Sequence, residues 1–235
     1  VAAVVVEPVL GEGGFVVPPA EYLPRLRALT ERHGILLIAD EVQTGFGRTG
    51  RLWAVEHSGV VPDILIAAKS IAGGLPLSSI TGRAEVMDAP GVGGLGGTFG
   101  GNPVSIAAAL AVLDQMQTGA LFERAEAIAR IVEEHARGWL GRFALVGDVR
   151  GLGAMWGIEL VEDRESRRPA GEATAEVARR CYEAGLVTIT AGTYGNVIRT
   201  LMPLVITDEQ LQEGLDVLDR ALTAVCEQGA SCKEQ

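Results

Sequence analysis

The sequence predicts an α/β fold built on a mostly parallel sheet, and three observations support this. Short, continuously apolar segments occupy residues 1–6, 35–39 and 64–68, and helical patterns separate them. Continuous apolar segments are typical of parallel strands that helices cover on both faces. Hydrophobic residues make up 48% of the 235-residue chain, which is enough for a sizeable core. We therefore expect a layered domain with helices on both sides of the sheet.

The first half of the chain also predicts two helices. The first runs over about 19–33, and Gly34 ends it. The second follows the glycine-rich segment 91–101, with Asn102 as the expected cap and Pro103 as the first helical residue. This second helix, PVSIAAALAVLDQM, is apolar on nearly every side, so we expect it to be buried. The apolar face of the first helix carries Tyr22, Leu23, Leu26 and Leu29.

The second half of the chain predicts a charged helix and six further elements. The charged helix spans about 121–140 and is expected to link two domains, with a boundary near residue 118. After it, the patterns predict strand, strand, helix, strand, strand and helix in that order. The last helix begins with a capping box formed by Thr207 and Gln210. Its apolar stripe consists of Leu211, Leu215, Leu218 and Leu222.

Charge and composition exclude several classes of function. The chain has 30 acidic residues against 20 lysines and arginines, a net charge of −10, and no basic stripe that nucleic acid would need. The six apolar residues before Glu7 are too few for a signal peptide or a membrane span. The cysteines, Cys181, Cys226 and Cys232, lack CxxC or metal-ligand spacing. We expect a cytoplasmic protein without a metal site. Because the chain starts inside an apolar strand, we also expect it to be the later part of a longer protein.

Polar side chains follow each of the three apolar strands. Glu7 follows the first strand, Asp40 and Glu41 follow the second, and Lys69 follows the third. Ligands of parallel α/β sheets collect beyond the carboxyl ends of the strands, so these side chains are candidates for a site. Lys69 ends an apolar segment, where partial loss of water would lower its pKa and favour a Schiff-base nucleophile. Two simpler interpretations stay open: a turn role for Asp40, and a Lys69 stem packed on the core with its amine in water.

The glycine-rich segment 91–101, GVGGLGGTFGG, has two interpretations. Its match to GxGxxG does not indicate a dinucleotide site, because no strand precedes it. Its backbone amides, the Thr98 hydroxyl and the following helix N-terminus suit a phosphate, whereas a flexible connector is the simpler alternative. No GxSxG, Walker or HExxH pattern occurs, so hydrolase and metalloenzyme functions have little support.

Five motifs occur in order along the chain: VVVEPVLGEGGF, LLIADEVQTGFGRTG, PDILIAAKSIAGGLPL, GGLGGTFGGNP and GDVRGLGAMWGIEL. Together they resemble class III pyridoxal-phosphate-dependent aminotransferases, and among these the enzymes that act on 4-aminobutyrate. The resemblance implies the PLP-dependent transferase fold type I, here an incomplete, mostly parallel sheet with flanking helices and a small α+β C-terminal domain. It assigns residues 1–117 to part of the large cofactor-binding domain, and residues 118–235 to a linking helix and the small domain.

The resemblance also implies roles for residues of the first domain. Lys69 would hold pyridoxal 5′-phosphate (PLP) covalently and move a proton between substrate and cofactor. Asp40 would pair with the protonated ring nitrogen, Val42 would pack on the ring, and Gln43 would hydrogen-bond near the ring hydroxyl. Thr98 would reach the phosphate bound by a neighbouring subunit, so a homodimer or larger assembly with a shared active site is expected.

The resemblance implies substrate contacts for two charged residues. Arg199 would bind the substrate α-carboxylate, although for Arg199 taken alone an ordinary strand-end arginine is the simpler interpretation. Glu12 would pair with Arg199 when an ω-amino substrate lacks that carboxylate, and would release the arginine for glutamate. Glu7 would support Gln43 from outside the direct contacts of the cofactor.

The segment LGGT at 95–98 is similar to the 4-aminobutyrate enzymes, whereas ornithine and acetylornithine enzymes usually carry HGST there. We therefore expect transamination of 4-aminobutyrate with 2-oxoglutarate, giving succinate semialdehyde and glutamate. Small amino acids and oxo acids are the expected partners, with no nucleic acid and no membrane. The resemblance covers only the later part of the family's chain. Three alternatives stay open: another ω-aminotransferase of the class, a truncated inactive protein, and the cofactor-binding half of a regulator.

Overall fold

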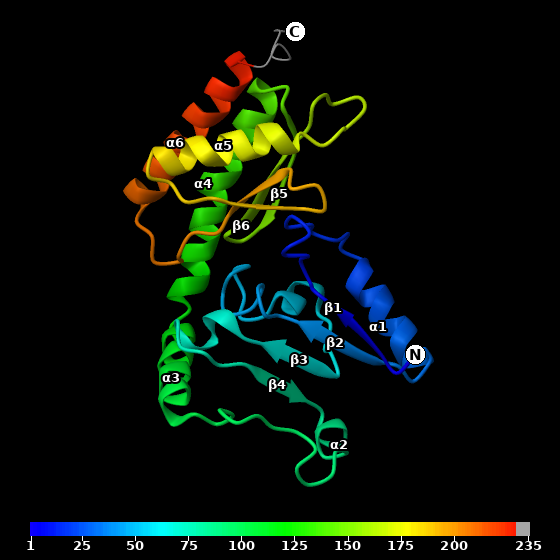
Figure 1. The fold of residues 1–235 in the computed structure, drawn as a ribbon. Coiled ribbons are helices and arrows are strands. Elements are labelled where there is room, and N and C mark those ends of the chain that lie inside the picture. The colour runs from blue at the N-terminus through cyan, green and yellow to red at the C-terminus, as the bar shows by residue number, and fades with distance from the viewer. Residues whose placement is uncertain (229–235) are drawn as a thin grey trace. The chain divides into compact units, whose positions relative to one another are not determined.

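The computed structural model describes residues 1–228, which form two compact units (Figure 1). Unit 1 comprises Val1–Val9 and Pro18–Glu123, and unit 2 comprises Leu10–Val17 and the described residues from Arg124 onward. The division after Glu123 is near the expected boundary at residue 118, but the segment at 10–17 packs with unit 2, against expectation. The assignment of a cofactor-binding domain and a small domain to these parts of the chain stays a prediction.

Unit 1 contains a four-stranded sheet in the order β1-β2-β3-β4 (Figure 1). β1 and β2 are parallel, as are β2 and β3, whereas β3 and β4 are antiparallel. The predicted α/β class and mostly parallel sheet are therefore confirmed. The fourth strand was not predicted from the sequence, because its segment SITG is too short and too polar to form an apolar run. The strands are β1 (Ala3–Val6), β2 (Leu36–Asp40), β3 (Ile64–Ala67) and β4 (Ser79–Gly82).

The predicted helices of unit 1 are present, with short helical turns between them. The side-chain oxygen of Asn102 accepts the N–H groups of Val104 (2.9 Å) and Ser105 (3.3 Å), so the predicted cap of α3 is confirmed. Gly34, with φ +62°, follows the end of α1 as expected. The helices are α1 (Tyr22–Arg32), η1 (Ala54–Ser58), η2 (Lys69–Ala72), α2 (Ala84–Met87) and α3 (Pro103–Gln117), where η marks a 3-10 helix.

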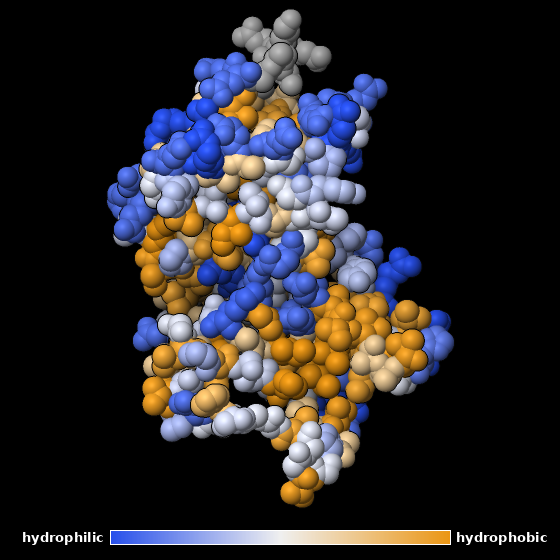
Figure 2. All heavy atoms as spheres, in the orientation of Figure 1, coloured by the Kyte–Doolittle hydropathy of each residue, from blue (hydrophilic) through white to orange (hydrophobic). Residues whose placement is uncertain are grey.

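The covering of α3 and of the unit 1 sheet differs from the prediction. On α3, Val104 and Leu110 are 66% and 58% exposed, and on the strands Val5 and Ile80 are 60% and 57% exposed. Figure 2 shows hydrophobic side chains, coloured orange, gathered on the surface over the strands of unit 1. The expectations of a buried α3 and of a sheet covered on both faces are therefore wrong for this chain. Among the described residues, too few elements pack on these apolar faces to cover them.

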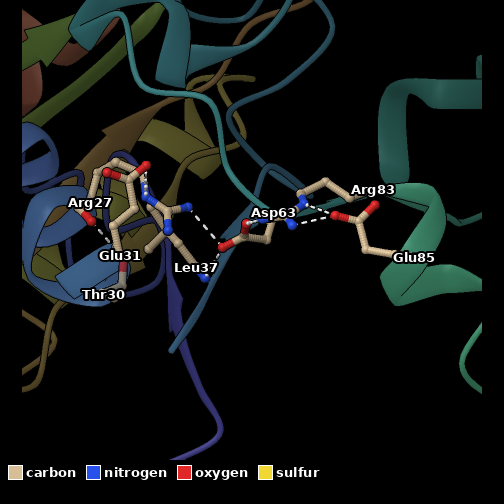
Figure 3. A network of polar contacts seen from close by, with 7 residues as sticks. All are labelled: Arg27, Thr30, Glu31, Leu37, Asp63, Arg83 and Glu85. Carbon is tan, nitrogen blue, oxygen red and sulfur yellow. Dashed lines mark hydrogen bonds and ion pairs between the residues drawn. The ribbon is translucent and has the colours of Figure 1, made fainter. Parts of the chain in front are cut away.

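A buried carboxylate, that of Asp63, joins three segments of unit 1 (Figure 3). It accepts the Leu37 N–H at 2.7 Å and forms ion pairs with Arg27 at 2.7 Å and Arg83 at 2.8 Å. Burial by itself would raise the pKa of Asp63, but the Leu37 N–H and the two guanidinium groups outweigh it. Together they hold the pKa below its ordinary value of 3.8. The network thereby links α1, β2 and the segment that precedes α2.

Unit 2 contains a second sheet, antiparallel throughout, in the order β5-β6-β8-β7. Helix α5 packs on this sheet and against α6. The predicted order of strand, strand, helix, strand, strand and helix after the charged helix is confirmed. The elements are α4 (Ala120–Arg142), β5 (Val146–Leu152), β6 (Met155–Leu160), α5 (Gly171–Glu183), β7 (Ile189–Ala191), β8 (Val197–Thr200) and α6 (Asp208–Gln228).

Helix α6 follows its prediction closely. The Thr207 hydroxyl oxygen accepts the Gln210 backbone N–H, and the Gln210 side-chain oxygen Oε1 accepts the Thr207 backbone N–H, both at 3.2 Å. This is the predicted capping box. All four leucines of the predicted stripe are buried. Trp139 of α4 donates to Asp219 of α6 at 2.8 Å, which fixes the two helices against each other.

Three observations concern membranes, cysteines and metals. No single helix within residues 1–228 is long and apolar enough to cross a membrane, although α3 and α4, a bent pair, meet that criterion when taken together. Cys181 is buried as a free thiol, and burial raises its pKa to about 11. Cys226 is also buried, and Cys232 lies outside the described residues. The described part of the chain contains no cluster of three or more metal-ligating side chains.

Candidate active site

Three candidate side chains of unit 1, those of Glu7, Asp40 and Lys69, follow strands that are parallel neighbours. Val6 of β1 pairs with Ala39 of β2, and Glu7 and Asp40 directly follow this pair. Lys69 follows the end of β3 by two residues. Because β1, β2 and β3 run in the same direction, their carboxyl ends lie at one edge of the sheet. This is the edge at which α/β sheets bind ligands.

Asp40 ends β2 and organises the turn that follows. Its Oδ1 accepts the Val42 N–H at 3.0 Å, which is the turn role that the sequence left open. The side chain is half-buried, and Oδ2 takes no part in that hydrogen bond. The turn role therefore leaves one carboxylate oxygen for a second partner, and the two interpretations of Asp40 are compatible.

Lys69 begins η2 in a strained backbone conformation. Its φ is +49°, in the left-handed region that costs a non-glycine residue roughly 1–2 kcal/mol. The Ile71 N–H donates to the Ala68 carbonyl at 3.1 Å and closes the turn around it. Backbone strain of this kind is concentrated at functional sites. The side chain itself is exposed, so the expected loss of water around its amine is wrong for this chain, in which no described element covers it.

Glu41, one of the polar side chains expected at the strand ends, has a structural role that the sequence did not predict. It is fully buried, and its carboxylate accepts the Thr44 hydroxyl and the N–H groups of Ala54 (3.0 Å) and Val55 (2.9 Å). Burial raises the pKa of Glu41, and the three neutral donors offset this only in part. Glu41 therefore fixes the loop between β2 and η1. The three-residue spacing of Glu41 and Thr44 in the sequence is compatible with their contact, but it does not predict the bonds to Ala54 and Val55.

The other cofactor candidates of unit 1 differ in their surroundings. Val42 and Gln43 are half-buried in the loop that Glu41 holds. Thr98 lies in a segment that is exposed from residue 91 to residue 100. Within residues 1–228, no hydrogen bond joins Thr98 to Asp40 or Lys69, and the phosphate role of the glycine-rich segment stays a prediction.

Arg199 is a buried cation in unit 2. It lies on β8, is 6% exposed, and donates from Nη1 to Oε1 of Glu12 at 2.7 Å. Its Cζ is 5.4 Å from the centre of the Phe15 ring, a cation–π distance. Its buried Nε–H has no hydrogen-bond partner among the described residues. A buried donor without an acceptor costs about 1–3 kcal/mol, so this edge of the guanidinium is suited to a further carboxylate oxygen.

The pairing expected between Glu12 and Arg199 is thus present, and it is asymmetric. The Glu12 side chain is 75% exposed, whereas that of Arg199 is 5% exposed. Because water already surrounds most of Glu12, its departure needs little change in its hydration. The buried Arg199, in contrast, requires some anion at all times.

Comparison with known proteins decides the family. Residues 1–222 match the family model of class-III aminotransferases. The chain belongs to the class III aminotransferases. It is 49% identical over 224 residues to a probable 4-aminobutyrate aminotransferase of Bacillus subtilis, a match that covers 95% of this chain and 51% of the relative. It is 50% identical over 218 residues to the 5-aminovalerate aminotransferase of Pseudomonas aeruginosa, with 93% and 51% covered.

The structural neighbours of this class III aminotransferase chain include an amine transaminase from an uncultivated Pseudomonas species, solved in its PLP-bound form. The TM-score is 0.87 at 38% identity, and the match covers 95% of this chain and 52% of that one. The predicted PLP-dependent transferase fold type I is therefore confirmed. The chain spans about half the length of the curated relatives it matches.

Proposed function

We propose that the protein catalyses PLP-dependent transamination of 4-aminobutyrate with 2-oxoglutarate, which yields succinate semialdehyde and glutamate. The observation that carries this proposal is Arg199, a buried guanidinium with a solvent-exposed carboxylate partner, Glu12, and a buried Nε–H without an acceptor in the described residues. Membership of class III and the name of the Bacillus subtilis relative support the same chemistry.

The pair of Glu12 and Arg199 accounts for two unlike substrates. Glutamate carries an α-carboxylate, which takes the Arg199 Nε–H and an Nη–H as a bidentate pair while Glu12 turns into water. 4-Aminobutyrate lacks that carboxylate, so Glu12 stays on Arg199 and neutralises its charge. Without either anion the buried guanidinium would be unpaired, at a cost of about 3–5 kcal/mol.

The donor set at the strand ends of unit 1 fits PLP chemically. The amine of Lys69 suits the aldehyde, the carboxylate of Asp40 suits a protonated ring nitrogen, and the amide of Gln43 suits the ring hydroxyl. When bound, PLP supplies an electron sink for the negative charge that develops at the substrate carbon.

The residues of this chain divide the remaining tasks. Lys69 would hold the cofactor through Nζ until the substrate amine takes its place on the aldehyde carbon. The Nζ freed in this way would then carry the proton away from the amino-bearing carbon of the substrate. Asp40, kept in place by the Val42 N–H at 3.0 Å, keeps the ring nitrogen protonated. Val42 packs on the ring, and Glu7 supports Gln43.

A second candidate donor is 5-aminovalerate, because the Pseudomonas aeruginosa relative named for it is 50% identical to this chain. It also lacks an α-carboxylate, so Glu12 and Arg199 would treat it as they treat 4-aminobutyrate. One methylene group is worth about 10-fold to 200-fold in discrimination. Measuring kcat/KM for both donors therefore decides between them.

We also infer a homodimer or larger assembly with a shared site, and a cytoplasmic location. Exposed apolar residues before and on α3, with Phe99 84% and Val104 66% exposed, support an interface close to Thr98. The buried free thiol of Cys181 suits a reducing compartment. The partners of this assembly are small amino acids and oxo acids, as transamination requires. A net charge of −10 disfavours nucleic acid as a partner.

Lys69→Ala tests the function directly, and the chain offers a matched control. The sequence contains two lysines, Lys69 and Lys233, of which Lys233 lies outside the described residues. We expect Lys69→Ala to lower kcat of the complete gene product by at least about 10⁴-fold, and Lys233→Ala to leave it unchanged. The measurement combines the PLP absorption spectrum, borohydride reduction and mapping of the modified lysine. Label on Lys233, or substantial turnover by Lys69→Ala, contradicts the proposal, and a truncated inactive protein would show no turnover at all.

A further inference from the structure

The loop at 10–17, which carries Glu12, has a backbone held at several points within unit 2. Leu10 and Val16 exchange backbone hydrogen bonds of 3.0 and 3.2 Å, which closes the loop. The Gly192 N–H donates to the Glu12 carbonyl at 3.0 Å. Phe15 is fully buried and has a left-handed φ of +52°. The loop is therefore pre-organised, while the side chain of Glu12 extends into water.

Arg150 of β5 adds a side-chain contact to this loop. Its Nε donates to the Gly14 carbonyl at 3.1 Å. Its Nη1 forms ion pairs with Glu159 at 2.5 Å and Asp148 at 2.8 Å, and its side chain is 17% exposed. Because two carboxylates orient the guanidinium, its Nε is held in place toward Gly14.

The register of the unit 2 sheet places this contact beside Arg199. Arg150 pairs with Gly157 of β6, and Gly157 pairs with Arg199 of β8. Directly paired residues share a face of an antiparallel sheet, so the two arginines flank Gly157 on one face. The loop passes over this glycine: a Cβ at Gly157 would lie 2.9 Å from the Gly14 carbonyl oxygen and 3.5 Å from Cβ of Phe15.

We propose that Arg150 is a positioning residue that holds the 10–17 loop over Gly157, so that the Glu12 side chain alone moves when substrates alternate. This inference rests on the proposed function. Glu12 must meet Arg199 accurately in the half-reaction of 4-aminobutyrate, which brings no α-carboxylate. In the glutamate half-reaction the substrate replaces Glu12, and the position of the loop matters less.

The test compares the two half-reactions in the complete PLP-loaded protein. We expect Arg150→Met to raise KM for 4-aminobutyrate about fivefold to tenfold and to leave KM for glutamate within about twofold, as Glu12→Gln also should. Because both changes act through one contact, the double variant should be no worse than Glu12→Gln alone. Gly157→Ala should also raise KM for 4-aminobutyrate, since its added Cβ would displace the Gly14 carbonyl oxygen and with it the loop.

Two further variants separate positioning from general destabilisation. Arg150→Lys keeps the charge for Glu159 but lacks the Nε–H, so its KM should lie between those of the wild type and Arg150→Met. Arg164 is the matched control, because it donates to the backbone carbonyls of Phe143 (2.8 Å) and Val146 (3.1 Å) and not to the 10–17 loop. Arg164→Met should lower the melting temperature without changing the ratio of the two KM values.

A readout without turnover completes the experiment. The affinity for 2-oxoglutarate, measured by calorimetry, should be unchanged or slightly higher in Arg150→Met, because Glu12 competes less well for Arg199. If Arg150→Met weakens both half-reactions equally and in addition to Glu12→Gln, the positioning role is overturned. If the wild type transaminates neither substrate and does not bind 2-oxoglutarate, the proposed function itself fails.

Discussion

The two units each contain an arginine–carboxylate cluster, and the two clusters are built in opposite ways. In unit 1 the carboxylate is buried: Asp63 is 3% exposed and is held by Arg27 and Arg83 (Figure 3). In unit 2 the arginine is buried: Arg199 is 6% exposed, and its partner Glu12 has a side chain that is 75% exposed. A solute cannot reach Asp63, so its cluster stabilises the fold. The partner of Arg199 faces water, as the proposed exchange for a substrate carboxylate requires.

The largest expected effect is on folding, at the cluster of unit 1. Asp63→Ala removes the shared acceptor of Leu37, Arg27 and Arg83, so we expect a loss of about 3 kcal/mol in the free energy of unfolding, measured with denaturant. The control is Glu85→Ala, which removes the 62% exposed partner of Arg83 and should cost less than about 0.5 kcal/mol. Equal losses of unfolding free energy in the two variants would contradict the conclusion that the buried Asp63 stabilises the fold more than the exposed Glu85 does.

The next effect is on catalysis, at the cluster of unit 2. Arg199→Ala removes the proposed site for the α-carboxylate, so kcat/KM for glutamate should fall about 100-fold, as for one partner of a buried charge pair. The loss for 4-aminobutyrate should be below about 10-fold, because that substrate leaves Arg199 to Glu12. Steady-state kinetics with both substrates measure the split. Equal losses of kcat/KM for the two substrates would contradict the proposal that a substrate carboxylate replaces Glu12 on Arg199.

The smallest expected effect is on the pH dependence of stability. It distinguishes Asp63 from Glu41, the second buried carboxylate among residues 1–228. Asp63 has charged partners and a lowered pKa, so its stabilisation is present above the ordinary value of 3.8 and is lost as pH falls through its folded-state pKa. Glu41 has neutral donors and a raised pKa, so its contribution declines as pH rises from the ordinary value of 4.5 toward its folded-state pKa. The melting temperature, measured at a series of pH values from 2 to 7, should therefore depend less on pH than in the wild type. We expect this on the acid side for Asp63→Asn and above about pH 4.5 for Glu41→Gln. Identical profiles for the two variants would contradict the opposite shifts.

Features that depend on neighbouring residues were predictable from the sequence. The cap formed by Asn102 and the box of Thr207 and Gln210 join groups two or three residues apart, so a short segment contains the whole interaction. The motifs of the class III family located Lys69, Asp40 and the pair of Glu12 and Arg199 for the same reason, because each occurs within a recognisable short pattern. Their roles in the reaction stay proposals.

Burial was not predictable in the same way. The apolar composition of α3 predicted a buried helix, yet Leu110 is 58% exposed, and Lys69 is exposed at the end of an apolar strand. Burial depends on what else packs against a segment, and for these residues no described element does so. The long-range bonds of Asp63 to Arg27 and Arg83 were missed because their spacing follows no helical or strand period.

The sequence by itself therefore determined the fold class and the helix caps, and it supplied the candidates for the chemically active side chains. Only the tertiary structure decided that the 10–17 loop packs with unit 2, and that Arg150, Gly157 and Arg199 form one row beneath it. The physical reason is that register between distant strands is set by backbone pairing and by burial of one sheet face. Neither is encoded in the spacing of the residues that the pairing brings together.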